Sequence, residues 1–301
     1  MPSVIVRLAL SVFLLTARGV QPARADLGTA PLRIVVSNYP LAYFAERIGG
    51  SRVQVTLPVP AGADPAFWKP DAKAVGLMQK ADLIALNGAG FEKWLVHVSL
   101  PKLKQVDTAE GFHDRYIHID NAVTHSHGPG GTHSHGGTAF TTWLDFEQAA
   151  RQAETLAQAM MRKRPEFTAS FSENLAALNA DLKALDSDAR RILGGRTDEP
   201  LLASHPVYQY LARRYGLKLE SIHWEPDEMP AAAEWEALAK LLAGHPAKTM
   251  LWEAEPSAAI AARLKTLGVA AVAFEPAANR PESGDFLGVM KQNLERFGRI
   301  R

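Results

Sequence analysis

Four of the ten histidines lie close together in one short polar segment. A doubled Thr-His-Ser-His unit within residues 124–137 contains His125, His127, His133 and His135, and the rest of the segment is Gly, Pro, Thr and Ser. Imidazole binds zinc, copper and nickel well, and His-x-His pairs can adapt to a tetrahedral or square-planar ion. We therefore expect a mobile surface loop that traps metal, because this composition cannot bury a core. The alternative is a solvated insertion whose histidines only titrate near pH ~6.5.

The composition of the chain that carries these histidines is typical of a globular protein. It has 301 residues, 47% hydrophobic and 22% charged, which is enough for two cores. Basic residues number 33 and acidic residues 32, so no positive excess favours nucleic acid as a partner. The sequence contains no Gly-rich phosphate loop, G-x-S-x-G elbow or H-E-x-x-H motif. We therefore do not expect an enzyme.

The first residues are typical of a secretory signal peptide. Arg7 precedes an apolar run at residues 8–17, and residues 23–25 have the small-x-small form of a cleavage site. The run is shorter than the ~20 residues of a membrane-spanning helix. There is no cysteine, hence no disulfide, no thiolate metal site and no cysteine for lipid attachment. We expect cleavage after residue 25 and a soluble periplasmic protein without a lipid anchor.

The remaining chain alternates strand-like and helix-like segments, which predicts a mainly parallel sheet. The expected strands are residues 32–37, 53–57, 83–86, 201–203, 218–222, 249–252 and 269–274. The expected helices end near residues 48, 79, 215, 242, 267 and 297. We predict an N-terminal α/β lobe at residues 26–164 and a C-terminal α/β lobe at residues 196–301.

One long helix is expected between the lobes, over residues 165–195. Apolar residues recur there at spacings of three and four: Phe167, Phe171, Leu175, Leu178, Leu182, Leu185, Ala189 and Ile192. A helix of this length spans about 40 Å and would join the lobes rigidly. The predicted fold class is therefore α/β, with two lobes on one backbone helix, a geometry suited to gripping a ligand.

Several short motifs resemble the solute-binding proteins of zinc and manganese ABC importers. They are Val-Val-Ser-Asn-Tyr-Pro-Leu-Ala-Tyr at residues 35–43, Asn-Gly-Ala-Gly-Phe-Glu at 87–92, Trp-Leu-Asp at 143–145, Ala-Ser-His-Pro at 203–206 and Phe-Glu-Pro at 274–276. The resemblance covers almost the whole chain after the signal peptide, in order. It implies two α/β lobes that hold one divalent ion in a cleft and deliver it to a membrane permease.

The resemblance also implies a ligand set of three histidines and one carboxylate, which this chain matches only in part. His205 and Glu275 stand at two of the four positions. Ala66, after the Gly-Ala-Asp-Pro turn at residues 62–65, and Thr141 stand at the other two. Two remaining ligands would leave a zinc ion half-coordinated, so unaltered tight binding is not expected.

Three repairs of this site are conceivable from the sequence. The loop histidines could fold into the cleft, Asp64, His118 or His223 could be recruited, or the loop alone could bind the ion. The alternatives are a hydrogen-bonded structural role for His205, a salt bridge to a nearby base for Glu275, and solvation for Asp64 and His223. Glu275 follows an expected buried strand, so it lies at the strand end where α/β ligand clefts form.

The sequence supports two hypotheses about function. In the first, a monomeric periplasmic protein captures a divalent ion, zinc before copper, manganese or nickel, and passes it to an ABC permease in the inner membrane. In the second, a ligand-depleted paralogue acts as a metal chaperone or buffer through its His-rich loop, or as a partner-binding module.

Overall fold

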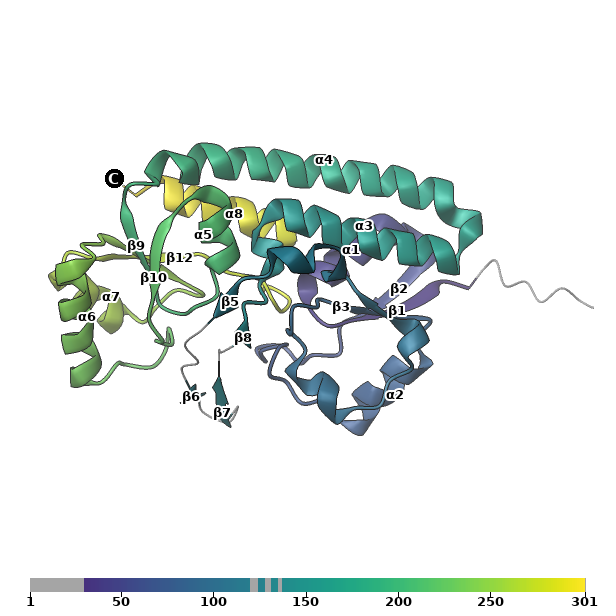
Figure 1. The fold of residues 1–301 in the computed structure, drawn as a ribbon, viewed down its shortest axis with the longest axis horizontal. Helices are drawn as coiled ribbons and strands as arrows, with labels where there is room; N and C mark the ends of the chain where they lie inside the picture. The colour runs from purple at the N-terminus through teal and green to yellow at the C-terminus, as the bar shows by residue number, and fades with distance from the viewer. Residues whose placement is uncertain (1–29, 120–123, 128–130, 135–136, 301) are drawn as a thin grey trace, which may run out of the picture. The chain divides into compact units, whose positions relative to one another are not determined.

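Two four-stranded parallel sheets form the framework of the protein (Figure 1). The computed structural model describes residues 30–119, 124–127, 131–134 and 137–300. The first sheet has the order β2-β1-β3-β4, with β1 at Leu32–Val36, β2 at Val53–Thr56, β3 at Leu83–Leu86 and β4 at Gln105–Asp107. The second has the order β10-β9-β11-β12, with β9 at Pro200–Ala203, β10 at Lys218–Ser221, β11 at Thr249–Trp252 and β12 at Ala270–Ala273. We call these sheets and their flanking helices the first and second lobes.

Helices connect and flank the strands, and the predicted α/β fold class is confirmed. The first lobe contains α1 (Tyr39–Gly49), α2 (Ala72–Lys80) and α3 (Phe146–Lys163); the second contains α5 (Gln209–Tyr215), α6 (Ala232–Gly244), α7 (Ala258–Thr266) and α8 (Phe286–Gly298). Local chemistry sets their starts: Asn38, Asp71, Asp145, Ser257 and Asp285 cap backbone N–H groups with their side chains.

The expected long helix is α4, at Thr168–Leu193 (Figure 1). Its 26 residues span about 39 Å at 1.5 Å per residue. Five positions of the predicted stripe are buried, Phe171, Leu178, Leu182, Leu185 and Ala189, while Leu175 and Ile192 are half-buried and Leu193 is buried in place of Ile192. The helix packs against α1 and α3 of the first lobe and against α8 of the second, so it contributes to one core with both.

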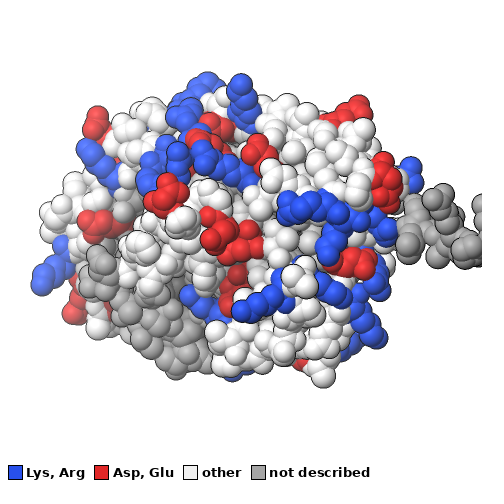
Figure 2. Space-filling model, turned by 45° about the vertical axis from the view of Figure 1, so that its right-hand side comes forward, with Lys and Arg blue, Asp and Glu red and all other residues white. Residues whose placement is uncertain are grey.

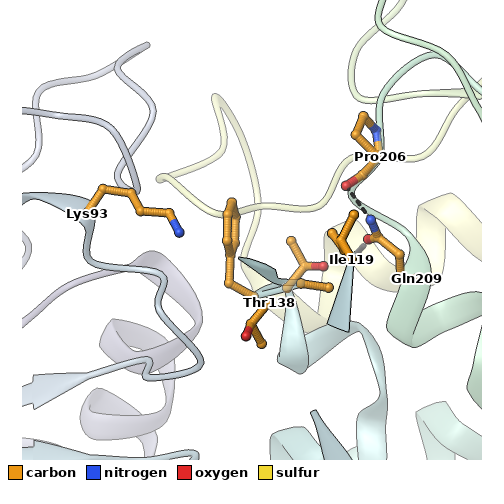
Figure 3. Close-up of a pocket in the computed structure, with 8 residues that line it drawn as sticks. Lys93, Ile119, Thr138, Pro206 and Gln209 are labelled. Carbon is orange, nitrogen blue, oxygen red and sulfur yellow. Dashed lines mark hydrogen bonds between the residues drawn. The ribbon is translucent and has the colours of Figure 1, made fainter. Parts of the chain in front are cut away.

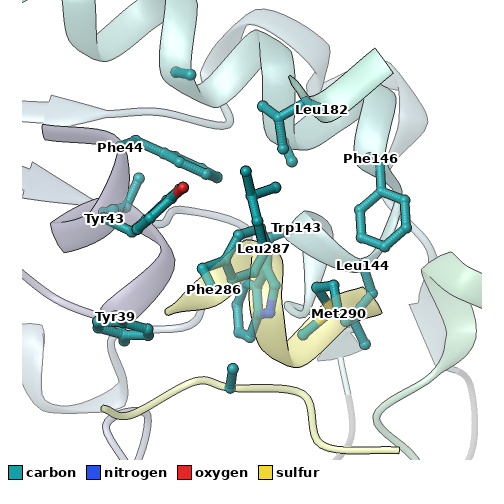
Figure 4. Packing of buried hydrophobic residues seen from close by; sticks show 14 of the residues in the cluster. Tyr39, Tyr43, Phe44, Trp143, Leu144, Phe146, Leu182, Phe286, Leu287 and Met290 are labelled. Atoms are coloured by element: carbon teal, nitrogen blue, oxygen red, sulfur yellow. The ribbon is translucent and has the colours of Figure 1, made fainter. Parts of the chain in front are cut away.

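The last helix continues this core into the first lobe (Figure 4). Phe286 of α8 packs edge-on against Phe44 of α1, with ring centres 5.6 Å apart, and lies 5.9 Å from the ring of Tyr43. Trp143 lies in the same cluster and is fully buried. The two lobes therefore share apolar packing as well as the long helix.

The His-rich segment differs from the expected irregular loop. Its described parts form two short antiparallel pairs, β5 (His118–Ile119) with β8 (Gly137–Thr138), and β6 (Thr124–His127) with β7 (Gly131–Ser134). Thr, Ser and His alternate along both inner strands, and a paired backbone needs no apolar core to satisfy its hydrogen bonds.

Some expectations from the sequence fall on residues that the structure does not describe. His135 and the expected signal peptide at residues 1–25 lie outside the described residues. Within the described part, no helix is both long enough and apolar enough to cross a bilayer.

Candidate metal site

His205 lies just beyond the carboxyl end of β9 and is only 6% exposed. The backbone around it is fixed to both neighbouring strands. Ser204 N donates to Leu251 O of β11 at 2.8 Å, and Trp224 N, just after β10, donates to Ser204 O at 2.7 Å. The imidazole is therefore held at the edge of the sheet where ligands of parallel α/β proteins bind.

Two carboxylates face this imidazole from the adjacent strands. Glu225 Oε1 lies 3.4 Å and Glu253 Oε1 3.8 Å from His205 Nδ1. Glu225 follows β10 and Glu253 follows β11, the two strands that flank β9. His223 also lies here, with its ring centre 5.6 Å from that of His205. Strand order thus brings nitrogen and oxygen donors of the second lobe to one place.

Burial and charge oppose each other at this cluster. Burial lowers the pKa of His205, but the hydrogen bond to Glu225 and the charge of Glu253 outweigh it, so the pKa is raised. Desolvation raises the pKa of Glu253 to about 7, against the influence of His205, although 36% of its side chain stays accessible. The charge of Asp64, from the first lobe, acts on both groups. A divalent cation would relieve this crowding of acidic groups.

The described residues form only part of a metal site. Within the described ranges, no group of three or more His, Asp or Glu side chains is arranged closely enough to hold a metal ion. A zinc site takes about four ligands, or three with an open position. His205 and its carboxylates are therefore a nucleus that needs further ligands or movement to complete.

Asp64 belongs to a turn that the second lobe holds in place. Its Oδ1 accepts from Ala66 N at 2.8 Å, and Asn279 Nδ2 donates to Pro60 O at 2.7 Å and to Ala63 O at 2.8 Å. Ala66, where the resemblance places a histidine, is fully buried in the main core. The side chain at this position therefore packs in the core and supplies no metal ligand.

Thr141, at the other altered position, joins the two lobes. It is 3% exposed, and its hydroxyl donates to the carbonyl oxygen of Val207. Nearby, Trp143 Nε1 donates to Pro276 O at 2.8 Å. The seam between the lobes at this point is made of protein hydrogen bonds.

Glu275 lies in a salt bridge, as the alternative from the sequence foresaw. Its Oε1 is 3.3 Å from Arg296 of α8, and its backbone N–H donates to Asn293 Oδ1 at 3.0 Å. The structure places this carboxylate one strand further from His205 than Glu253, after β12.

A small cavity of about 10 Å³ lies between the lobes, next in sequence to His205 at Pro206 (Figure 3). Lys93, Phe140 and Thr141 line it from the first lobe, and Pro206 and Gln209 from the second. Lys93 Nζ lies 5.5 Å from the centre of the Phe140 ring, and burial lowers its pKa. Gln209 Nε2 donates to Pro206 O at 2.8 Å. Among the described residues that line the cavity there is no histidine or carboxylate, so it is separate from the His205 cluster.

Reasoning from the sequence selected His205, Asp64 and His223 but not Glu225 or Glu253. The structure brings His205 and His223 together and brings Asp64 within their electrostatic range. The signal for the two missed residues was their position, since each follows a strand as His205 does. In the paired strands β6 and β7, His125 lies opposite His133.

Comparison with known proteins supports a metal-uptake family. Residues 34–299 match the family model described as "Zinc-uptake complex component A periplasmic". Zinc-binding lipoprotein AdcA of Streptococcus pneumoniae is 28% identical over 280 residues, covering 88% of this chain and 54% of AdcA. The chain thus spans about half the length of the first curated relatives it matches.

Solved structures share the fold. The Zn(II)-bound ZnuA-like domain of S. pneumoniae AdcA has a TM-score of 0.76 at 24% identity, covering 90% of this chain and 98% of that domain. The metal-dependent lipoprotein YcdH of Bacillus subtilis has a TM-score of 0.75 at 22% identity, covering 89% of this chain and 98% of YcdH.

Proposed function

Since the chain belongs to the family of the periplasmic zinc-uptake complex component A, we propose that it is a periplasmic solute-binding protein that captures zinc for an ABC permease. The observation that carries this proposal is the buried imidazole of His205 with Glu225 and Glu253 beside it. Zinc accepts imidazole nitrogen and carboxylate oxygen together in one site. The relative AdcA, described as zinc-binding, supports the choice of cargo.

The proposed ligand set lies mainly in the second lobe. His205, Glu253 and Glu225 are its nucleus, and His223 and Asp64 are the described residues placed to complete it. Glu275 would join only after leaving Arg296. The protein performs no bond chemistry on the ion; it binds, retains and releases zinc.

Protons compete with the ion at this site. Zinc binds neutral imidazole and ionised carboxylate, so binding releases the protons that His205 and Glu253 hold near neutral pH. Apparent affinity therefore falls as the pH falls through the range in which these groups titrate. Release to the permease then requires competing ligands or protonation.

The His-rich strands favour a second role, as a collector or buffer of metal. The pairing register sets His125 opposite His133, and His127 lies two residues from His125 on the same strand. Residues opposite each other, and residues two apart, share one face of an antiparallel pair. His125, His127 and His133 thus occupy one face of the pair by register. We propose that this face binds metal more weakly than the His205 cluster.

The test is calorimetric titration of zinc into metal-stripped protein purified from the periplasm. The proposal expects one tight site, lost in His205→Ala and weakened in Glu253→Gln, because each removes a donor. His113→Gln is the matched control, since His113 is exposed and its ring contacts only its own helix at Glu110 O. Deleting residues 124–137 should remove only weak sites.

Two outcomes would contradict the proposal. If His205→Ala binds zinc as tightly as the unaltered protein, the ion lies elsewhere. If all binding disappears with residues 124–137, the cleft carries no ion and the buffer role stands alone.

A further inference from the structure

Large apolar side chains are exposed on one part of the first lobe. Leu103 is 94% exposed in the short 3-10 helix Lys102–Lys104, Val96 is 83% exposed in Lys93–His97, and Leu77 of α2 is 41% exposed. They are three of the five most exposed large apolar residues among those described. Single exposed aliphatic residues are ordinary, but a group on one surface calls for an explanation.

These three elements form one continuous surface. Gln79 Nε2 at the end of α2 donates to Ser99 O at 3.2 Å, and Lys104 Nζ donates to Gln79 O at 2.9 Å. Beneath them lies a single apolar cluster that includes Met78, Trp94 and Leu100. The surface is therefore held in one arrangement by its own packing.

Lysines surround the apolar residues on this surface. Lys73, Leu77 and Lys80 are spaced four and three apart on α2, which puts them on one exposed stripe, and Lys102 and Lys104 flank Leu103. Figure 2 turns the side of the molecule with α2 forward; in its lower right part Lys and Arg side chains lie among uncharged ones, with Asp and Glu side chains beside them.

Basic residues predominate in the segments that form this surface. Residues 72–81 and 93–106 contain no Asp or Glu, although the whole chain is nearly balanced. Within the described part of the chain, none of Lys73, Lys80, Lys102 and Lys104 forms an ion pair with a carboxylate. We call the exposed residues Lys73, Leu77, Lys80, Val96, Lys102 and Leu103, together with the half-buried Lys104, the basic apolar surface.

We propose that the basic apolar surface binds the anionic headgroups of a phospholipid bilayer, with Leu103 entering the headgroup layer. Lysines beside aliphatic residues suit this partner, because the long side chains reach phosphates while the apolar residues insert. A protein partner fits less well, since protein interfaces are depleted of lysine and enriched in arginine and aromatic residues.

Weak, reversible adsorption of this kind would keep the protein near the membrane that holds the proposed permease. The inference is independent of metal binding, because none of its residues belongs to the His205 cluster.

Co-sedimentation with vesicles tests the inference, using protein purified from the periplasm. The vesicles are phosphatidylcholine alone, or phosphatidylcholine with phosphatidylglycerol, each at low and high salt. We expect binding only to the anionic vesicles and only at low salt. The variant K73Q/K80Q/K102Q should bind about 100-fold more weakly, at about fivefold per lysine. Lys104 is left in place because it bonds Gln79.

The matched control removes three exposed lysines elsewhere, in K183Q/K240Q/K265Q, and should bind as the unaltered protein does. The inference is overturned if the unaltered protein ignores anionic vesicles, or if both triple variants lose binding equally. It is also overturned if sedimentation velocity shows a dimer that Leu103→Ser dissociates while vesicles are not bound, since a second copy would then be the partner.

Discussion

Replacing Glu92 by glutamine should flatten the pH dependence of stability between about pH 4.5 and pH 7. Glu92 ends the Asn-Gly-Ala-Gly-Phe-Glu motif and is 8% exposed. Its carboxylate accepts from Asn87 N at 2.6 Å and from Gly88 N at 3.3 Å. Asn87 Nδ2 in turn donates to Phe140 O at 2.9 Å, next to Thr141 at the lobe seam. Glu92 thus supports the first-lobe side of the site.

The magnitude follows from the raised pKa of this group. Burial raises the pKa of Glu92 from its ordinary 4.5 to about 7, despite hydrogen bonds from Ser37 and Asn87 that act the other way. The folded state therefore holds the proton more tightly than the unfolded state. The stability this contributes is complete below pH 4.5 and is lost as the pH rises to 7, a change of about 3 kcal/mol at about 1.4 kcal/mol per unit.

Urea unfolding, followed by tryptophan fluorescence at steps from pH 4.5 to pH 8, measures this change. Glu92→Gln is neutral at every pH, so its free energy of unfolding should gain about 3 kcal/mol relative to the unaltered protein across that range. Glu236→Gln is the control, because Glu236 is exposed on α6 and should keep the original slope. Parallel pH profiles for the unaltered protein and Glu92→Gln would refute the reasoning.

Two further substitutions, each with a control, test how much single contacts between helices and between lobes contribute to stability. Arg214→Met removes the bidentate partner of Asp186, whose side chain is 16% exposed, while Arg190 and the Tyr215 hydroxyl still bond that carboxylate, so it should lower the free energy of unfolding by about 1–3 kcal/mol. Arg190→Met, at a 55% exposed side chain, should cost under about 1 kcal/mol, and equal losses would contradict this. Thr141→Val leaves the carbonyl of Val207 without its hydroxyl donor and should cost about 1–3 kcal/mol in urea unfolding. Thr141→Ser keeps the donor and should stay near the unaltered value; a loss as large as that of valine would assign the effect to packing.

Much of the fold could be predicted because its signals are local. β3 and β11 are short apolar runs with the expected bounds, and α4 buries the stripe that its spacing predicts. α3 was not foreseen, because small residues such as Ala149, Ala153 and Ala157 make up much of its buried side. β4 has only three residues and takes its place by pairing with β3, which local sequence does not encode.

The site was predictable only in part because strand order is a long-range property. His205 could be located from its motif, but its partners depend on β10 and β11 being the neighbours of β9. Glu275 follows β12, which pairs with β11 and not with β9, and so it reaches Arg296 instead. The motif indicates Glu275, whereas strand order places Glu225 and Glu253 beside His205.

Ala66 and Thr141, which stand where the resemblance places ligands, affect how the proposed cargo, zinc, would be released. With Ala66 in the core and the hydroxyl of Thr141 bonded to Val207, the lobes are held together by contacts that need no ion. If ligands were divided equally between lobes, opening the lobes would remove half of the coordination at once. In the proposed site the described nucleus lies in the second lobe alone, so opening would leave His205, Glu225 and Glu253 in place. Release must then depend on competition for those three groups, by protons or by ligands of the permease.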